Sequence, residues 1–199
     1  GSLANPVEIE LKAASLLTAS ATAGGIWLEE KTGDINALTI TTSTGDTWLK
    51  TAGSILDAQT ETSSTLLNIS GRAVILTAVG GTVGTLASPL EINSANGGAG
   101  NVSASSLGDI FLTETSGDLS LGHVHNTNAR VFLVGPASIL NGIGLASGFN
   151  VDAASLNITA GTAATSNVGS ASAPILTRIH RLAGTAGGSV WLENTGTLT

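Results

Sequence analysis

The feature that most constrains the fold is a stretch that returns later in the chain. Residues 45–57 read GDTWLKTAGSILD, and residues 129–141 read ARVFLVGPASILN. Trp48 then corresponds to Phe132, a difference in residue number of 84 (132 − 48). Self-similarity at a fixed period indicates a repeat architecture, in which each unit buries its apolar side against its neighbours.

Other segments keep the same offset. The segment GIWLE contains Trp27 and the segment DIFL contains Phe111, and their residue numbers again differ by 84 (111 − 27). A third copy, SVWLE, contains Trp191. We expect superrepeats at about 5–88, 89–173 and, as a partial copy, 174–199. Residues 1–2 are interpreted as a cloning remnant, and residues 3–199 as one continuous segment of a longer protein.

A shorter beat lies within each superrepeat. Trp27 and Trp48 differ by 21 in residue number (48 − 27), as do Phe111 and Phe132 (132 − 111), so four such coils would make 84 (4 × 21). Coils of this length are typical of a β-solenoid, and the frequent Gly, Ser, Thr and β-branched residues leave no amphipathic helix. The sequence therefore predicts an all-β parallel β-helix. A tandem array of β-sandwich domains, one to each superrepeat, is the alternative, against which the shorter beat argues.

Composition limits the classes of function. Apolar residues make up 42% of the chain and the net charge is −7, so the chain is not predicted to be disordered. A pI near 4.7 argues against nucleic acid or an anionic membrane as a partner. No apolar run approaches the ~18 residues of a membrane span. Cysteine is absent, which excludes disulfides and thiolate metal sites.

Period-two alternation predicts which side chains point outward. In GIWLE, Ile26 and Leu28 share one face of the strand and Trp27 takes the other. A polar residue at the middle position of a sister strand, Ser120 between Leu119 and Leu121, marks that position as outward. Five of the six aromatic residues occupy such middle positions and are the candidate ligand- or partner-binding residues: Trp27, Trp48, Phe111, Phe132 and Trp191. The alternative is a stacking ladder covered by a loop of the same chain.

The polar motifs have structural interpretations. His123 and His125 would project from one strand face, but with no third ligand apparent we expect surface residues and no metal site. The Gly-Asp pairs that contain Asp34, Asp46, Asp109 and Asp118 suit turns in which Asp bonds nearby backbone. Asn68, Asn101 and Asn157 fit the glycosylation sequon, but we expect them in turns or ladders. With scarce charge clusters and no catalytic motif, we expect neither an enzyme nor a cofactor.

The repeated units resemble those of filamentous haemagglutinin-like bacterial surface proteins. The units that carry this resemblance are GGIWLEEKTGDINAL, GDTWLKTAGSILDA and GDIFLTETSGDLSLG. The resemblance covers most of the chain at the level of repeat style. It implies a right-handed parallel β-helix, export to the bacterial surface or beyond, and a stalk or adhesive role.

Two hypotheses of function follow. In the first, the chain is a structural segment of a surface adhesin, a stiff rod without catalysis. In the second, it is a binding module that recognises a cell-surface glycan or protein through the outward aromatic row. We also expect end-to-end self-association, because a solenoid leaves strand edges unpaired at its ends.

Overall fold

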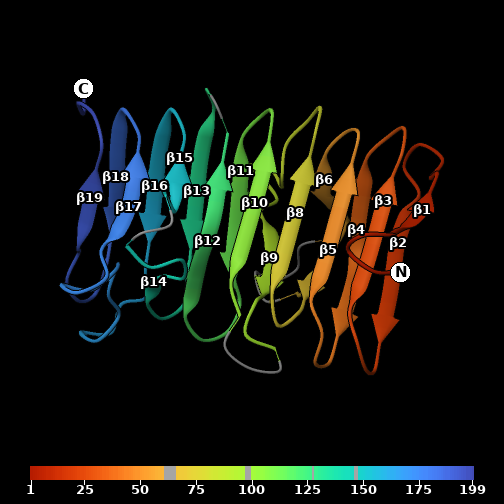
Figure 1. Cartoon of the computed structure of the whole chain (residues 1–199), viewed down its shortest axis with the longest axis horizontal. Helices are drawn as coiled ribbons and strands as arrows, with labels where there is room; N and C mark the ends of the chain where they lie inside the picture. Colours follow the sequence, from red (N-terminus) through yellow and green to blue (C-terminus); the bar gives the residue numbers. More distant parts are fainter. Residues whose placement is uncertain (61–65, 97–99, 127, 146–147) are drawn as a thin grey trace.

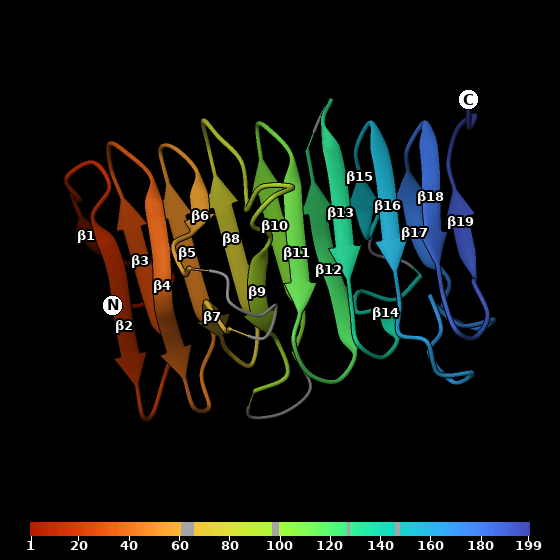
Figure 2. The same cartoon turned by 180° about the vertical axis from the view of Figure 1, so that it is seen from behind.

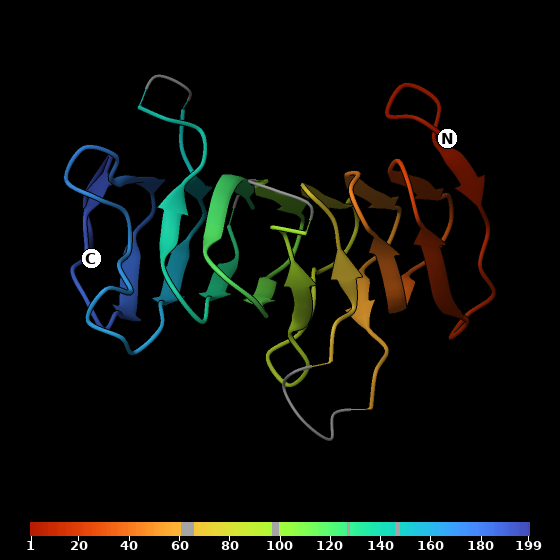
Figure 3. The ribbon, with the colours of Figure 1, turned by 90° about the horizontal axis from the view of Figure 1, so that it is seen from below.

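The structure, a computed structural model, describes residues 1–60, 66–96, 100–126, 128–145 and 148–199. Within these residues there is no helix, and the strands pair in parallel into two sheets. The two sheets form opposite walls of one continuous coil, with the termini at opposite ends of the rod (Figure 1, Figure 3). The predicted parallel β-solenoid is confirmed, and an array of separate β-sandwich domains is excluded.

The sheet nearer the viewer in Figure 1, here called the front sheet, has nine strands in succession and one side strand. In order these are β1 (Val7–Ile9), β3 (Ile26–Glu30), β5 (Thr47–Thr51), β8 (Val74–Ala78), β10 (Val102–Ser106), β12 (Leu119–His125), β15 (Val151–Asp152), β17 (Ile175–Arg178) and β19 (Leu192–Asn194), with β14 (Ile139–Asn141) beside β12. Nine successive strands correspond to eight turns of the solenoid.

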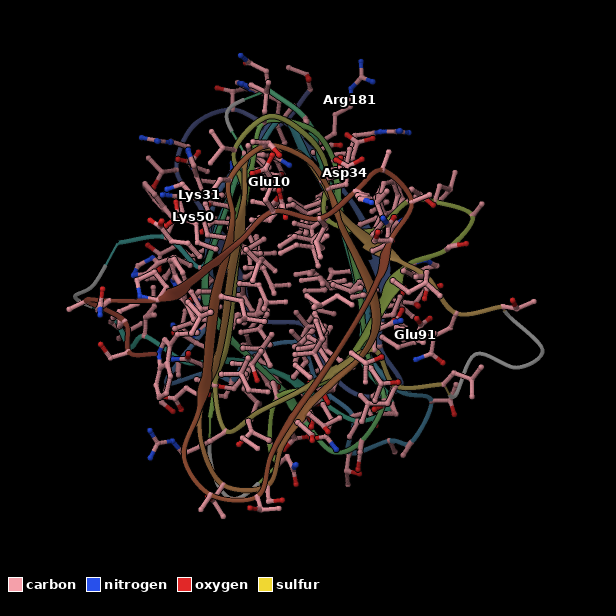
Figure 4. The ribbon with its side chains drawn as sticks, turned by 90° about the vertical axis from the view of Figure 1, so that its right-hand side faces the viewer. Glu10, Lys31, Asp34, Lys50, Glu91 and Arg181 are labelled. Carbon is pink, nitrogen blue, oxygen red and sulfur yellow. The ribbon has the colours of Figure 1, made fainter. Side chains whose placement is uncertain are left out.

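The opposite sheet, here called the back sheet, is seen from its outer side in Figure 2. Its strands are, in order, β2 (Leu16–Ala21), β4 (Ile35–Thr42), β7 (Ile69–Ser70), β9 (Leu90–Asn93), β11 (Ile110–Glu114), β13 (Arg130–Val134), β16 (Ser155–Thr159) and β18 (Arg181–Thr185), with β6 (Ile55–Asp57) beside β4. The chain alternates between the sheets. It rises along the front sheet and descends along the back sheet as it advances, which makes the coil right-handed, as expected (Figure 1, Figure 4).

The core is a narrow aliphatic column between the two sheets. In β5, Leu49 is fully buried while Trp48 and Lys50 on either side point outward. In β13, Val131 and Leu133 are fully buried and Phe132 between them is half-buried. The inward and outward positions predicted from period two are thus confirmed in these strands.

The coils are unequal in length, contrary to the expectation of a uniform 21-residue coil. The register partners differ by 21 in residue number between β3 and β5 (47 − 26), but by 27 between β5 and β8 (74 − 47) and by 28 between β8 and β10 (102 − 74). Extra residues lie in the connections between strands, where insertions do not disturb the ladder.

As a result, the 84-residue repeat spans three and a half turns rather than four. Counting along the chain from β3, the strands of the front and back sheets alternate until β11, which lies in the back sheet. Segments that correspond at the 84-residue offset, such as β3 and β11, therefore lie on opposite sides of the solenoid.

The aspartates of the Gly-Asp pairs join successive coils. Asp34 Oδ1 accepts a hydrogen bond from the Ser54 backbone N–H at 2.6 Å, and Asp118 Oδ1 accepts one from Ser138 at 2.8 Å. Asp109 accepts the Arg130 N–H in the same way, also at 2.8 Å. The sequence-based expectation of bonds to nearby backbone was wrong, because each donor belongs to the next coil. These carboxylates stabilise the stacking of coils at the turns.

The sequon asparagines differ in environment. Asn68 is fully buried and its side-chain amide donates to Ala37 O (3.0 Å) and Asp57 Oδ1 (2.6 Å), as expected for a ladder residue. Asn157, in contrast, lies in mid-strand on the outer side of β16. The expectation of a turn or ladder position was wrong for Asn157.

Candidate functional site

The first pair of candidate aromatics lies on the front sheet. Trp27 of β3 and Trp48 of β5 are register partners, and Ile75 of β8 continues the row. Both indoles are half-buried. A Cβ atom at Gly25 would lie 2.5 Å from Trp27 Cη2, so the indole lies against the Gly25 backbone, and the absence of a side chain at Gly25 is needed for this contact.

A charged row runs beside the tryptophans. Lys50 Nζ lies 2.9 Å from Glu29 Oε1, and Lys31 Nζ lies 3.3 Å from both Glu29 and Glu8 (Figure 4 labels both lysines). Lys50 lowers the pKa of Glu29, with a smaller contribution from Lys31. All of these groups are accessible to solvent, so the row gives the surface a pattern of charge rather than much stability.

The second pair lies on the back sheet. The rings of Phe111 and Phe132 stack with centroids 4.7 Å apart and planes inclined by 17°. The Arg130 guanidinium lies over both rings, at 5.9 and 5.7 Å, and is held by Asp109 through Nε (3.0 Å) and Nη2 (2.5 Å). Burial tends to raise the pKa of Asp109, but the hydrogen bonds from Arg130 outweigh it and the pKa is lowered.

Phe111 is covered by another part of the same chain. It is only 4% exposed, its N–H donates to Val83 O at 2.7 Å, and a Cβ at Gly84 would lie 3.4 Å from its own Cβ. The segment before β9 therefore crosses beside the ring. Phe132, the other member of the pair, is half-buried.

Trp191 belongs to neither pair. It lies just before β19, where its N–H donates to Val168 O (2.7 Å) and its carbonyl accepts from Ile175 (3.0 Å). The five candidate residues therefore do not form one row: two lie on the front sheet, two on the back sheet, and one beside the final strand. The expectation of a single outward stripe was wrong, because the 84-residue offset exchanges the sheets.

The histidines lie on the front sheet and face solvent. His123 Nδ1 is 3.0 Å from Phe149 O, and His125 Nδ1 is 3.3 Å from Asp152 Oδ2, which also pairs with Arg178. Among the described residues no group of three or more metal-ligating side chains comes together.

Two buried glutamates, which the sequence analysis did not single out, occupy equivalent positions of the superrepeat (114 − 30 = 84). Glu30 accepts hydrogen bonds from the N–H groups of Leu11 (2.7 Å), Thr32 (3.0 Å) and Gly33 (3.1 Å). Glu114 accepts bonds from the Ser94 N–H (3.1 Å) and hydroxyl (2.6 Å). Each carboxylate thus binds the backbone of a turn from inside the coil.

The two glutamates differ in their acidity. Both are 1% exposed. Burial opposes ionisation of Glu30, but its backbone donors prevail and its pKa is lowered. Burial raises the pKa of Glu114 to about 7. Glu30 lies near the N-terminal end of the rod, whereas Glu114 lies mid-rod with coils on both sides, so desolvation is stronger at Glu114.

A hollow on the outer side of the back sheet was also missed. Its volume is about 410 Å³, and Phe132, Ser155, Asn157, Arg181 and Ala183 are among the residues that line it. The signal available in the sequence was the alternation in SLNIT, which places Ser155 and Asn157 outward. The unequal coils concealed that Phe132, Asn157 and Ala183 are aligned across β13, β16 and β18.

The fold and these surfaces define the chain as a repeat protein of the parallel β-solenoid class. Comparisons with family models, with curated proteins and with solved structures find no match. Among the described residues, no helix has the length and apolar character needed to cross a membrane.

Proposed function

We propose that the chain is a structural segment of an exported bacterial surface protein, forming part of a stiff stalk or adhesin body without catalysis. The observation that supports this most is the continuity of both sheets along the chain. Each coil contacts its neighbours, so a rod of this kind can be lengthened without a new core.

The contacts between coils are suited to carrying load. Parallel backbone ladders run along both walls, and carboxylates at the turns add bonds from coil to coil, as at Asp34 and Asp118. Such bonds must break in succession if the rod is pulled apart. Rigidity of this kind is what a spacer requires.

Surface location is the direct test of this proposal. Antibodies raised against the chain should label intact cells of the bacterium that encodes it, and protease added outside the cells should remove the label. Label that appears only after the cells are lysed would contradict the proposal. A periplasmic marker protein that stays protected in the same cells serves as the control.

End-to-end self-association belongs to the same proposal. At the C-terminal end Leu182 is 40% exposed and Val190 is 53% exposed, beside a hollow of about 340 Å³ that Ile158 also lines. The edges of β18 and β19 can pair with β1 and β2 of a second copy. Light scattering should show assemblies that grow with concentration and shrink in a Leu182→Lys variant, whereas a strict monomer would contradict the self-association.

Binding of a glycan or protein through the tryptophans is the second candidate. It is favoured by the alignment of two half-buried indoles, Trp27 and Trp48, next to the charged row. Only this pair, and not a stripe of five, would form the contact. Ligand-dependent change in tryptophan emission that is lost in Trp48→Ala but retained in Trp191→Phe would support this candidate, and an unchanged response in Trp48→Ala would contradict it.

A further inference from the structure

The hollow on the back sheet lies where large side chains give way to small ones. Across β11, β13, β16 and β18, the outward row reads Phe111, Phe132, Asn157 and Ala183. The step from an aromatic ring to an amide and then to a methyl group leaves the volume of about 410 Å³. This size is within the range of small-molecule sites.

The polar groups that line the hollow have unused hydrogen-bonding capacity. Among the described residues, the side chains of Ser155, Asn157 and Arg181 bond to no other residue. Inward and turn asparagines of the same rod behave differently. Asn126 and Asn150, for example, donate their amides to backbone carbonyls at 3.2 and 2.9 Å. A hydroxyl, an amide and a guanidinium are thus available to a ligand at one place.

The charge of the arginine in the hollow is uncompensated. A neighbouring outward row contains Arg130, Ser155 and Arg181 on β13, β16 and β18. The charge of Arg130 is matched by Asp109. No carboxylate side chain of the described residues lies within 4 Å of Arg181, which is exposed (Figure 4). A free guanidinium pairs well with a carboxylate, because its planar N–H groups match the two oxygens.

We propose that this hollow binds a sugar unit that carries a carboxylate, such as a hexuronate or a nonulosonate. The exposed side of Phe132 packs against the C–H face of the sugar ring. Asn157 and Ser155 bond to hydroxyl groups, and Arg181 binds the carboxylate. The proposal is independent of the stalk role, since a rod can carry such a site on its wall.

Titration calorimetry of the whole chain tests the proposal. The probes are methyl glucuronoside and N-acetylneuraminic acid, each compared with its uncharged methyl ester, at concentrations that reach about 10 mM. We expect the free acid to bind at least about tenfold more tightly than the ester, because the ester loses the charged pairing with Arg181. Equal binding of acid and ester, or no binding of either acid, would overturn the proposal.

Variants locate the binding in the hollow. Arg181→Gln should weaken binding of the acid by about tenfold or more and remove the preference over the ester. Asn157→Ala should weaken acid and ester alike. Arg178→Gln, which changes an arginine of the front sheet paired with Asp152, is the control and should alter neither. Retained affinity in both Arg181→Gln and Asn157→Ala would overturn the assignment.

Inorganic sulfate distinguishes a sugar site from a simple anion site. Competition by sulfate at the same concentration as the acid, with full displacement, would mean that Arg181 binds anions without reading the sugar and would overturn the proposal. A thermal unfolding curve for each variant confirms that it is folded. If Arg181→Gln does not fold, Phe132→Leu replaces it and should likewise weaken binding of both acid and ester.

Discussion

Trp27 and Phe111 occupy equivalent positions of the superrepeat, yet they lie on opposite sheets of the solenoid. The reason is that the repeat spans three and a half turns. A surface feature repeated at this period alternates between the two walls of the rod. Each wall of a longer array would then carry a given feature once in every two repeats.

Gly45 allows two turns to approach closely, and its replacement is predicted to be costly. A Cβ at Gly45 would lie 2.1 Å from the Gly24 carbonyl oxygen, which is backbone and cannot move aside easily. We expect Gly45→Ala to lower the free energy of unfolding by about 2 kcal/mol or more, as an overpacked site does.

Gly33 is the matched control for this substitution. A Cβ at Gly33 would meet no atom within 4 Å, and its backbone is not in the left-handed region. Gly33→Ala should therefore be neutral or stabilising by less than about 1 kcal/mol. Urea unfolding measures both variants, and equal losses would contradict the predicted packing of the turns.

Glu114 is predicted to make the rod less stable as the pH rises. Its pKa in the folded state is about 7, against 4.5 as the ordinary value. The folded state therefore holds a proton that the unfolded state releases. This stabilisation is present below about pH 4.5 and is lost as the pH rises through 7, an effect on the order of 3 kcal/mol.

Glu114→Gln should remove this part of the pH dependence, because the amide cannot ionise. At pH 8 the variant should be more stable than the parent chain, and at pH 4 it should be of similar stability. Chemical unfolding at a series of pH values measures this. A variant whose stability follows the parent curve across pH 4–8 would show that Glu114 titrates normally.

Glu30 is predicted to have the opposite dependence. Its pKa is lowered in the folded state, so its contribution is present above the ordinary pKa and is lost as the pH falls through the folded value. Glu30→Gln should cost about 1–2 kcal/mol at pH 7, because three N–H donors lose a charged acceptor, and less at pH 3. A larger loss at pH 3 than at pH 7 would contradict this sign.

The aspartate at the turn should tolerate an amide better than a methyl group. Asp118→Ala removes the acceptor of the Ser138 N–H and should cost about 1 kcal/mol. Asp118→Asn keeps an oxygen in place and should cost less than half of this. Thermal unfolding of the two variants side by side checks the prediction, and equal losses would show that the hydrogen bond contributes nothing.

Strand content and side-chain direction could be predicted from the sequence, because both depend on local alternation. Trp27 and Trp48 were placed on adjacent strands for this reason, and so were Phe111 and Phe132. The assignment of strands to sheets could not be predicted from a uniform coil. The two longer coils, which precede β8 and β10, place those strands further along the chain than a uniform coil does.

The candidate sugar site was beyond the sequence for the same reason. The residue numbers of Phe132 and Asn157 differ by 25 (157 − 132), and those of Asn157 and Ala183 by 26 (183 − 157), so a 21-residue period does not align them. The burial of Phe111 also could not be foreseen. It depends on the segment at Val83 and Gly84 crossing beside the ring, a contact that no strand pattern encodes.

Cysteine cross-linking tests the central claim, a continuous parallel solenoid with unequal coils. The chain has no cysteine, so any disulfide must come from the introduced pair. Ile75 and Ser103 are register partners on adjacent strands (103 − 75 = 28), at a separation that suits a disulfide. Ile75→Cys with Ser103→Cys should form a disulfide under mild oxidation of the folded protein, and Ile75→Cys with Asn96→Cys, at the uniform spacing (96 − 75 = 21), should not. Cross-linking of the second pair without the first would contradict the account.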